Sequence, residues 1–288
     1  MIRFIYFIPF LILSSCIKNN PDPSWIQINE WSLQSNIELS GAEGELTENI
    51  SEAWVYVNDK IIGVFQVPCK IPVLTSGMAN IKIFPAVKNN GISASKKIYP
   101  FLEVYEVNQE LVQNQTVVFN PTTKYKSITK FKIYDFELTN MFLENDPNTS
   151  LAQIEYANTD LQAFNGNFYG KVLLNQIDTA WVAYTTEQLQ FVKGRDVYLE
   201  LDYYNTNSVI TGLIFVEPDG TTTDNPNIQL NGQSDSDVRW KKIYIDLKEL
   251  IGNSPPGSNF LQSFQARLNS GKTNSEIRID NIKLVYFD

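Results

Sequence analysis

Histidine is absent from this 288-residue sequence. Nucleophilic catalysis by Ser-His-Asp or Cys-His groups is therefore excluded, and so are zinc and iron sites that use histidine ligands. Carboxylate chemistry is the catalytic chemistry that this composition leaves open. With no other catalytic motif in the chain, the sequence predicts a protein that binds rather than catalyses.

Cysteine and basic residues are also scarce. The two cysteines are Cys16 and Cys69, so a framework of disulfides is excluded. Lys and Arg number 23 against 32 Asp and Glu, which gives a formal net charge of -9. A nucleic-acid partner calls for a basic surface, so this balance argues against one.

Long apolar runs are confined to the N-terminus. An arginine at position 3 precedes an apolar stretch of about ten residues, which has the length of a signal-peptide core and is too short to cross a bilayer. No later segment reaches the roughly 18 apolar residues that a transmembrane helix needs. Residues 13–16, Leu-Ser-Ser-Cys, then resemble the lipobox of bacterial lipoproteins.

The lipobox resemblance implies a cleaved signal peptide over residues 1–15 and lipidation of Cys16, with residues 16–24 as a polar, proline-containing tether. Several acyl chains hold a protein on a membrane without a spanning helix, because each buried methylene adds about 0.8 kcal/mol. The expected location is the outer membrane, with the extracellular face favoured over the periplasmic face. An ordinary secretory signal followed by a chance cysteine is the alternative.

Residues 25–126 consist of short β-rich runs broken by turn residues, which predict an antiparallel β-sandwich. One predicted hairpin joins residues 53–57 to residues 61–65 through a turn at 58–60. This stretch, with Pro68 and Gly77 after it, resembles the small Ig-like or PEGA-like domains of bacterial surface proteins. The resemblance implies a fold but no ligand.

Residues 127–288 predict a second all-β unit, with strands at 197–204, 212–216, 242–247 and 276–286. Residues 225–236 are rich in Asn, Gln, Gly and Ser and predict a loop, while residues 248–252 predict a single helical turn. Segments 134–137, 166–174, 239–247 and 279–284 together resemble the galactose-binding-like jelly roll to which many carbohydrate-binding modules belong. The fold class expected is thus all-β, with two tandem antiparallel sandwiches, the second a jelly roll.

The jelly-roll resemblance implies two candidate sites. Glu137 and Asp280 stand where members of the family hold a structural calcium ion. The alternative is that Asp280 caps a turn or pairs with Arg278 while Glu137 is solvated. Tyr203 and Tyr204 end a strand before a polar loop and are the candidate glycan platform. Adjacent strand residues point to opposite faces, so one of these two tyrosines is expected inside the sandwich and the other outside.

Asp178-Thr179-Ala180 resembles the short motif at which Bacteroidota O-glycosylate exported proteins on the threonine, which makes Thr179 a candidate glycosylation site. Three functions remain open. The first is a non-catalytic interaction subunit of an outer-membrane protein complex, and the second is a surface glycan-binding lipoprotein. The third, a glycoside hydrolase, is remote, since no catalytic motif surrounds any carboxylate. None of the three requires a cofactor, and the structural calcium ion is an additional expectation from the jelly-roll resemblance.

Overall fold

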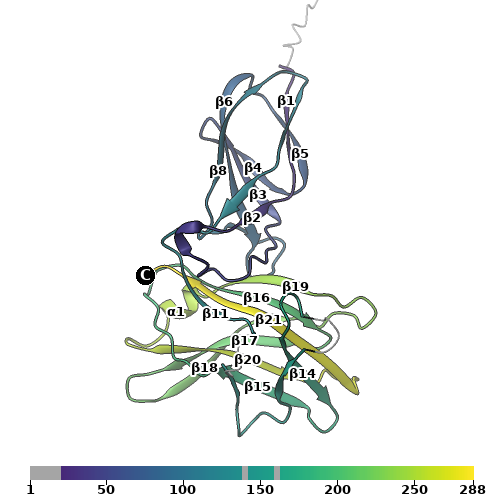
Figure 1. Cartoon of the computed structure of the whole chain (residues 1–288), viewed down its shortest axis with the longest axis vertical. Coiled ribbons are helices and arrows are strands. Elements are labelled where there is room, and N and C mark those ends of the chain that lie inside the picture. The colour runs from purple at the N-terminus through teal and green to yellow at the C-terminus, as the bar shows by residue number, and fades with distance from the viewer. Residues whose placement is uncertain (1–20, 138–141, 159–162) are drawn as a thin grey trace, which may run out of the picture.

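β-Strands dominate the secondary structure of the described chain and helices are few, which confirms the predicted all-β fold class. The structure is a computed structural model, and it describes residues 21–137, 142–158 and 163–288. Two β-sandwiches follow one another along the chain, and the first stands on one sheet of the second (Figure 1). Neither short helix in the described residues is long and apolar enough to cross a membrane.

The N-terminal sandwich packs a three-stranded sheet, of order β5-β1-β9, against a larger sheet of order β4-β3-β6-β7, in which β8 also pairs with β6. Its buried centre is apolar, with Ile26 and Val55 as members from the two sheets. The strands are β1 (Ser24–Ile28), β3 (Glu52–Val57), β4 (Lys60–Gln66), β5 (Cys69–Val73), β6 (Gly77–Lys88), β7 (Lys96–Ile98), β8 (Tyr105–Leu111) and β9 (Thr116–Phe119). A short pair, β2 (Ser32–Gln34) and β10 (Thr122–Lys124), and a 3-10 turn, η1 (Ile37–Leu39), lie beside them.

The hairpin predicted around residues 58–60 is confirmed. Asn58 and Asp59 connect β3 to β4 with φ angles of 50° and 60°. Two consecutive residues in the left-handed region match the twist of the flanking strands, and Asn and Asp tolerate this region better than most residues. Two pairings depart from the antiparallel expectation, since β1 runs parallel to β9 and β2 runs parallel to β10.

The C-terminal sandwich has two antiparallel sheets. The first, here named the junction sheet, has the order β13-β14-β21-β16-β19, with β11 also paired to β21. Its strands are β11 (Lys130–Tyr134), β13 (Ile154–Ala157), β14 (Tyr169–Asn175), β16 (Val197–Asn205), β19 (Lys241–Asp246) and β21 (Asn274–Tyr286). The second, named the outer sheet, has the order β12-β15-β20-β17-β18. Its strands are β12 (Leu143–Asn145), β15 (Ala180–Thr185), β17 (Val209–Val216), β18 (Thr222–Leu230) and β20 (Asn259–Arg267).

The segment at 225–236 corrects the sequence prediction. Residues 225–230 belong to strand β18 rather than to a loop, and β18 forms the edge of the outer sheet beside β17. Edge pairing needs backbone hydrogen bonds but few apolar side chains, so a polar composition did not reveal the strand. The register with β17 shifts between Thr211 and Gly212, where Pro226 faces Gly212. Proline is tolerated in strands at such edges and bulges. The helical turn is confirmed as α1 (Lys248–Gly252).

The junction sheet is covered on both faces. Leu199 and Leu201 of β16 enter the core between the two sheets, where they join Trp181 and Phe264 of the outer sheet. The residues that alternate with them are equally buried, because the N-terminal sandwich covers the other face. Tyr198 of β16, for instance, belongs to the apolar core of the N-terminal sandwich. The two sandwiches therefore share buried surface.

Candidate functional site

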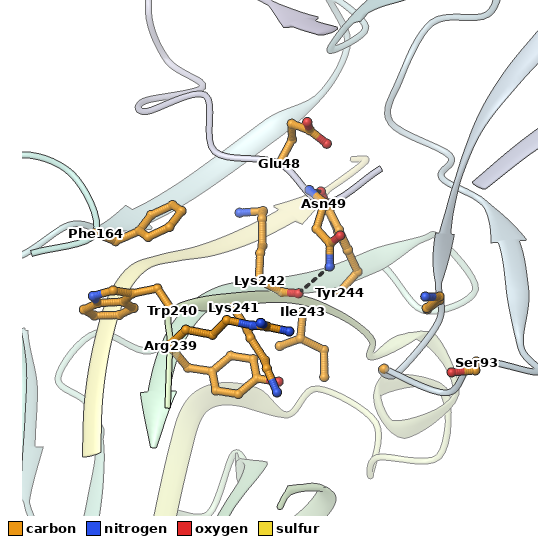
Figure 2. Close-up of a pocket in the computed structure, with 13 residues that line it drawn as sticks. Glu48, Asn49, Ser93, Phe164, Arg239, Trp240, Lys241, Lys242, Ile243 and Tyr244 are labelled. Atoms are coloured by element: carbon orange, nitrogen blue, oxygen red, sulfur yellow. Dashed lines mark hydrogen bonds between the residues drawn. The ribbon is translucent and has the colours of Figure 1, made fainter. Parts of the chain in front are cut away.

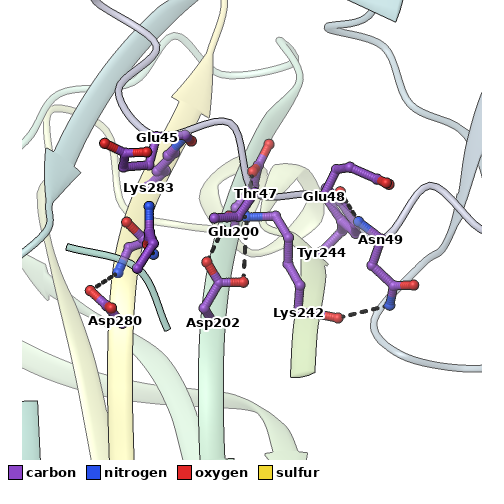
Figure 3. Close-up of polar contacts among 12 residues, drawn as sticks. Glu45, Thr47, Glu48, Asn49, Glu200, Asp202, Lys242, Tyr244, Asp280 and Lys283 are labelled. Carbon is purple, nitrogen blue, oxygen red and sulfur yellow. Dashed lines mark hydrogen bonds and ion pairs between the residues drawn. The ribbon is translucent and has the colours of Figure 1, made fainter. Parts of the chain in front are cut away.

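A cluster of charged side chains lies buried where the N-terminal sandwich meets the junction sheet (Figure 3). Glu200 and Asp202 come from β16 and Lys242 comes from the neighbouring strand β19. The Lys242 ammonium lies 3.0 Å from Glu200 Oε2 and 3.9 Å from Asp202 Oδ1. All three residues are nearly inaccessible to solvent, with Lys242 the most exposed at 6%.

The N-terminal sandwich supplies the remaining partners of this cluster. The hydroxyls of Tyr99 and Tyr125 both donate to Glu200 Oε1, each at 2.7 Å. Lys242 donates to Thr47 Oγ1 at 2.9 Å, and the Thr47 hydroxyl donates to Asp202 at 2.7 Å. Buried polar groups are costly unless they are hydrogen-bonded, so these contacts tie the two sandwiches together.

The protonation states of the cluster follow from its partners. Burial raises the pKa of Glu200, but the ammonium groups of Lys242 and Lys283 and the tyrosine hydroxyls outweigh burial, so this pKa lies below its usual value. Burial lowers the pKa of Lys242, but Glu200 and Asp202 outweigh it, and the pKa is raised. Glu200 and Lys242 are thus a charged pair at neutral pH. Because each charge of this pair is engaged with the other and with neighbouring side chains, the pair stabilises the fold and leaves no free group to bind a ligand.

A cavity of about 600 Å³ opens beside the cluster, between the two sandwiches (Figure 2). Both sandwiches contribute to its wall, and the residues are Glu48, Asn49, Lys88, Gly91, Ser93, Phe164, Tyr203, Arg239, Trp240, Lys241, Lys242, Ile243 and Tyr244. This volume lies within the range of about 300–1,000 Å³ that is typical of small-ligand sites. The cavity, here named the junction cavity, is the candidate binding site.

Hydrogen bonds between the sandwiches border the junction cavity. Asn49 Nδ2 donates to the carbonyl of Lys242 at 3.1 Å, and the Asn49 amide donates to the Tyr244 hydroxyl at 3.0 Å. On the other side, the Asn90 amide donates to the Tyr244 carbonyl at 2.8 Å. The N-terminal wall of the cavity is therefore hydrogen-bonded to strand β19 at two places.

Aromatic rings form one side of the junction cavity. Trp240 is partly exposed and has the Phe164 ring at 5.8 Å, measured between ring centroids. Behind it, the rings of Tyr169 and Tyr204 each lie 6.1 Å from the indole ring. A partly exposed indole beside polar groups is a surface on which a sugar ring can stack, because its face is apolar and flat.

The two candidate platform tyrosines lie in different surroundings. Tyr203 packs against the sandwich core and also lines the junction cavity, and burial raises its pKa. Tyr204 lies on the other face of β16, where the Arg278 guanidinium stands 4.3 Å above the centre of its ring. Tyr204 is therefore the tyrosine that points away from the core of the C-terminal sandwich. It is half-buried rather than exposed, because Arg278 covers its ring. Trp240, which the sequence analysis did not select as the platform, occupies the cavity instead.

Glu137 and Asp280, the candidate calcium ligands, have protein partners. The exposed Glu137 carboxylate accepts hydrogen bonds from the amides of Asn167 and Phe168, at 2.6 and 2.8 Å. Asp280 is buried, and burial raises its pKa to about 8, with the Asp202 carboxylate adding to the rise. In the described ranges no three His, Cys, Asp or Glu side chains gather closely enough to hold a metal ion. The calcium site stays a prediction.

The two modification sites also stay predictions. Thr179 lies half-buried in the turn between β14 and β15, where its carbonyl accepts a hydrogen bond from the Leu268 amide at 2.8 Å. Cys16 falls outside the described residues. Cys69 is half-buried at the start of β5, and burial raises its pKa, as an unreactive thiol requires.

A second, smaller hollow of about 400 Å³ lies on the outer sheet, on the side remote from the N-terminal sandwich. Its lining includes Ile210, Gln229, Gln265 and Arg267. Among the described residues, no aromatic side chain lines this hollow. The junction cavity is therefore the better candidate for a ligand that stacks on a ring.

Comparisons with known proteins return carbohydrate-binding modules among solved structures. A xylan-binding domain of family 22 covers 54% of this chain and 93% of its own length, with 13% identity and a TM-score of 0.37. The family 22 xylan-binding domain of Xyn10C from Paenibacillus barcinonensis covers 55% and 94%, with 12% identity and a TM-score of 0.37. The family 11 module of Lic26A-Cel5E from Clostridium thermocellum covers 54% and 93%, with 12% identity and a TM-score of 0.35. Neither a family model nor a curated protein matches the chain.

Proposed function

We propose that this chain is a non-catalytic glycan-binding protein, and that the oligosaccharide lies in the junction cavity against Trp240. The observation that carries the proposal is the composition of the cavity wall, where Trp240 and Phe164 stand opposite polar groups of Asn49 and Ser93. Sugar rings present apolar faces and hydroxyl edges, so a site for them needs both an aromatic surface and hydrogen-bonding groups.

Binding is favoured over hydrolysis by the charges of the cavity. Glycoside hydrolysis requires two carboxyl groups that flank the scissile bond, about 5–10 Å apart. Glu48 is the single acidic residue among the described lining residues. The Glu48 carboxylate already takes part in the fold, because it accepts a hydrogen bond from the Ile50 amide at 2.6 Å. A second carboxylate for catalysis is missing from this wall.

The proposal includes the lipid anchor at Cys16 and a place on the outer face of the outer membrane. Strand β1 begins at Ser24, at the end of the N-terminal sandwich remote from the junction sheet (Figure 1). A tether that precedes Ser24 would leave the molecule at that end. The N-terminal sandwich would then separate the junction cavity from the membrane. That position would suit the binding of glycans outside the cell.

An array of neutral and acidic oligosaccharides tests the proposal with the full chain, its Trp240→Ala and Phe164→Ala variants and a control. The control is Tyr184→Ala, since Tyr184 is a similarly half-buried aromatic residue on β15 of the outer sheet. We expect binding by the wild type and Tyr184→Ala, and a loss of tenfold or more in Trp240→Ala, since truncating an aromatic residue at the centre of a binding site commonly costs about 2 kcal/mol or more. Melting temperatures identify any variant that fails to fold.

Two results contradict the proposal. An array without signal for the folded wild type would exclude glycan binding. Loss of binding in Tyr184→Ala but not in Trp240→Ala or Phe164→Ala would move the site to the outer sheet.

An interaction subunit of an outer-membrane protein complex is the second candidate function. The observation in its favour is a pair of apolar side chains at the tip of the N-terminal sandwich, Leu74 and Met78, each 71% exposed. They flank the turn between β5 and β6, whose Thr75 carbonyl accepts a hydrogen bond from Ser24, where the tether would begin. Co-purification of a stoichiometric membrane protein that is lost in Leu74→Asp/Met78→Asp would favour this function.

A further inference from the structure

The junction cavity holds three cations without an ion-pair partner. Lys88 at the end of β6, Arg239 before β19 and Lys241 on β19 all line it. None of the three makes an ion pair with any residue that the structure describes. The wall therefore presents three such cations against a single acidic residue, Glu48, in a protein whose formal net charge is -9.

Three other cations at the same junction have an ion-pair partner. Lys96 lies 2.7 Å from Glu52, Lys97 lies 2.6 Å from Asp246, and Lys242 lies 3.0 Å from Glu200. Of these pairs, Lys97 with Asp246 crosses from one sandwich to the other, whereas Lys96 with Glu52 and Lys242 with Glu200 each lie within one sheet. Cations that line one cavity raise the local concentration of anions, so the cavity favours an anionic ligand.

The carboxylate of the cavity does not cancel these charges. Burial raises the pKa of Glu48, and the buried Lys242 acts against this rise. The other acidic residue that acts on Glu48, Glu30, raises its pKa further. Even with Glu48 ionised and Lys242 neutralised by Glu200, the wall keeps a surplus of positive charge from Lys88, Arg239 and Lys241.

We infer that the glycan in the junction cavity is acidic, and that Arg239, Lys241 and Lys88 bind an anionic group on a sugar ring that stacks on Trp240. This inference rests on the proposed glycan-binding function. The guanidinium of Arg239 offers a planar fork of donors that suits a carboxylate or a sulfate, and the two lysines add point charges. Arg239 and Trp240 are neighbours in the chain, and both line the cavity.

Isothermal titration of the full chain with three matched oligosaccharides tests the inference. The probes are an oligogalacturonate, the corresponding neutral galactose oligomer and a sulfated galactose oligomer. We expect the acidic probes to bind more tightly than the neutral one by tenfold or more. This preference should fall as the salt concentration rises from 50 to 500 mM, because salt screens the attraction between charges. The two acidic probes distinguish a carboxylate from a sulfate as the anion.

Charge variants locate the effect. Arg239→Gln/Lys241→Gln should weaken binding of the acidic probe at least tenfold and leave binding of the neutral probe unchanged, since hydrogen bonds to charged groups are stronger than those between neutral groups. The matched control is Lys60→Gln/Arg195→Gln, which removes one exposed lysine and one exposed arginine that also lack ion pairs. Lys60 lies in the β3–β4 hairpin and Arg195 lies before β16, so this control changes net charge without touching the cavity wall.

The outcomes separate the inference from the function on which it rests. Equal affinity for acidic and neutral probes, with both lost in Trp240→Ala, would overturn the acidic ligand and leave glycan binding intact. An acidic preference that disappears equally in the control variant would assign it to net charge and overturn the role of Arg239 and Lys241. Absence of binding to every probe would overturn the proposed function itself.

Discussion

Thr47 and Asp202 lie 155 residues apart in the chain, and the Thr47 hydroxyl donates a 2.7 Å hydrogen bond to the Asp202 carboxylate. Thr47 belongs to the N-terminal sandwich and Asp202 to strand β16 of the junction sheet. Both are buried, at 8% and 0% exposure. The contact links the sandwiches at a point where neither residue has solvent as an alternative partner, so the arrangement of the two sandwiches depends on it.

Replacing Lys242 by methionine should destabilise the protein strongly. The substitution leaves the Glu200 carboxylate buried opposite an apolar chain, and breaking such a pair costs about 3–5 kcal/mol. Chemical denaturation followed by tryptophan fluorescence measures the loss. Lys97→Met is the matched control, because Lys97 is 44% exposed in its pair with Asp246 and such surface pairs contribute less than about 1 kcal/mol. Similar small losses in both variants would show that Glu200 is not held as a buried anion.

Asp280 should make the stability depend on pH between about 4 and 8. Its pKa is raised to about 8 by burial, so the folded state keeps a proton that the unfolded state releases near pH 4. Stability is then greatest at low pH and falls as pH rises through this window, with a slope of up to about 1.4 kcal/mol per pH unit. Lys283, whose pKa burial lowers to about 8, changes its contribution only above that pH.

The variant Asp280→Asn assigns this slope, because asparagine resembles the protonated carboxyl in shape and cannot ionise. We expect its free energy of unfolding to fall less between pH 5 and 8 than that of the wild type. Glu48 and Asp202, whose pKa values are also raised by burial, contribute with the same sign and remain in both proteins. Identical slopes in variant and wild type would mean that Asp280 is ionised in the folded state.

A shared calcium ion at Glu137 and Asp280 makes a different prediction. Calcium binding to the folded state alone adds about 2.7 kcal/mol of stability at a hundredfold excess over Kd, so a chelator should lower the melting temperature of the full chain. Calcium should also abolish the pH slope of Asp280, because the ion favours the ionised carboxylate. No bound metal by elemental analysis, with an unchanged melting temperature, would refute the calcium site.

Lipidation of Cys16 predicts that Cys16→Ser moves the protein from the membrane fraction to the soluble fraction, or blocks removal of the signal peptide. Fractionation with immunoblotting and mass spectrometry of the N-terminus measures both. The variant Cys69→Ser is the control, since Cys69 lies inside the N-terminal sandwich at the start of β5 and should not affect anchoring. A processed Cys16→Ser protein that stays on the membrane is incompatible with the lipid anchor.

The sequence alone determined the all-β class, the β3–β4 hairpin and the one-turn helix α1. These features depend on local chemistry, since Asn58 and Asp59 tolerate the left-handed turn and alternating residues define each strand. The polar edge strand β18 escaped prediction because its pairing with β17 uses backbone groups, which every residue carries.

Tertiary structure decided where the candidate site lies. Glu200 and Asp202 alternate with Leu199 and Leu201, a pattern that fits a strand with one face in water. Alternation separates the two faces of a sheet but does not show whether water or another domain covers the polar face. The N-terminal sandwich covers it here, which buries the charges and forms the junction cavity. Lys88 and Arg239 meet in that cavity from different sandwiches, and only the packing of the two sandwiches brings them together.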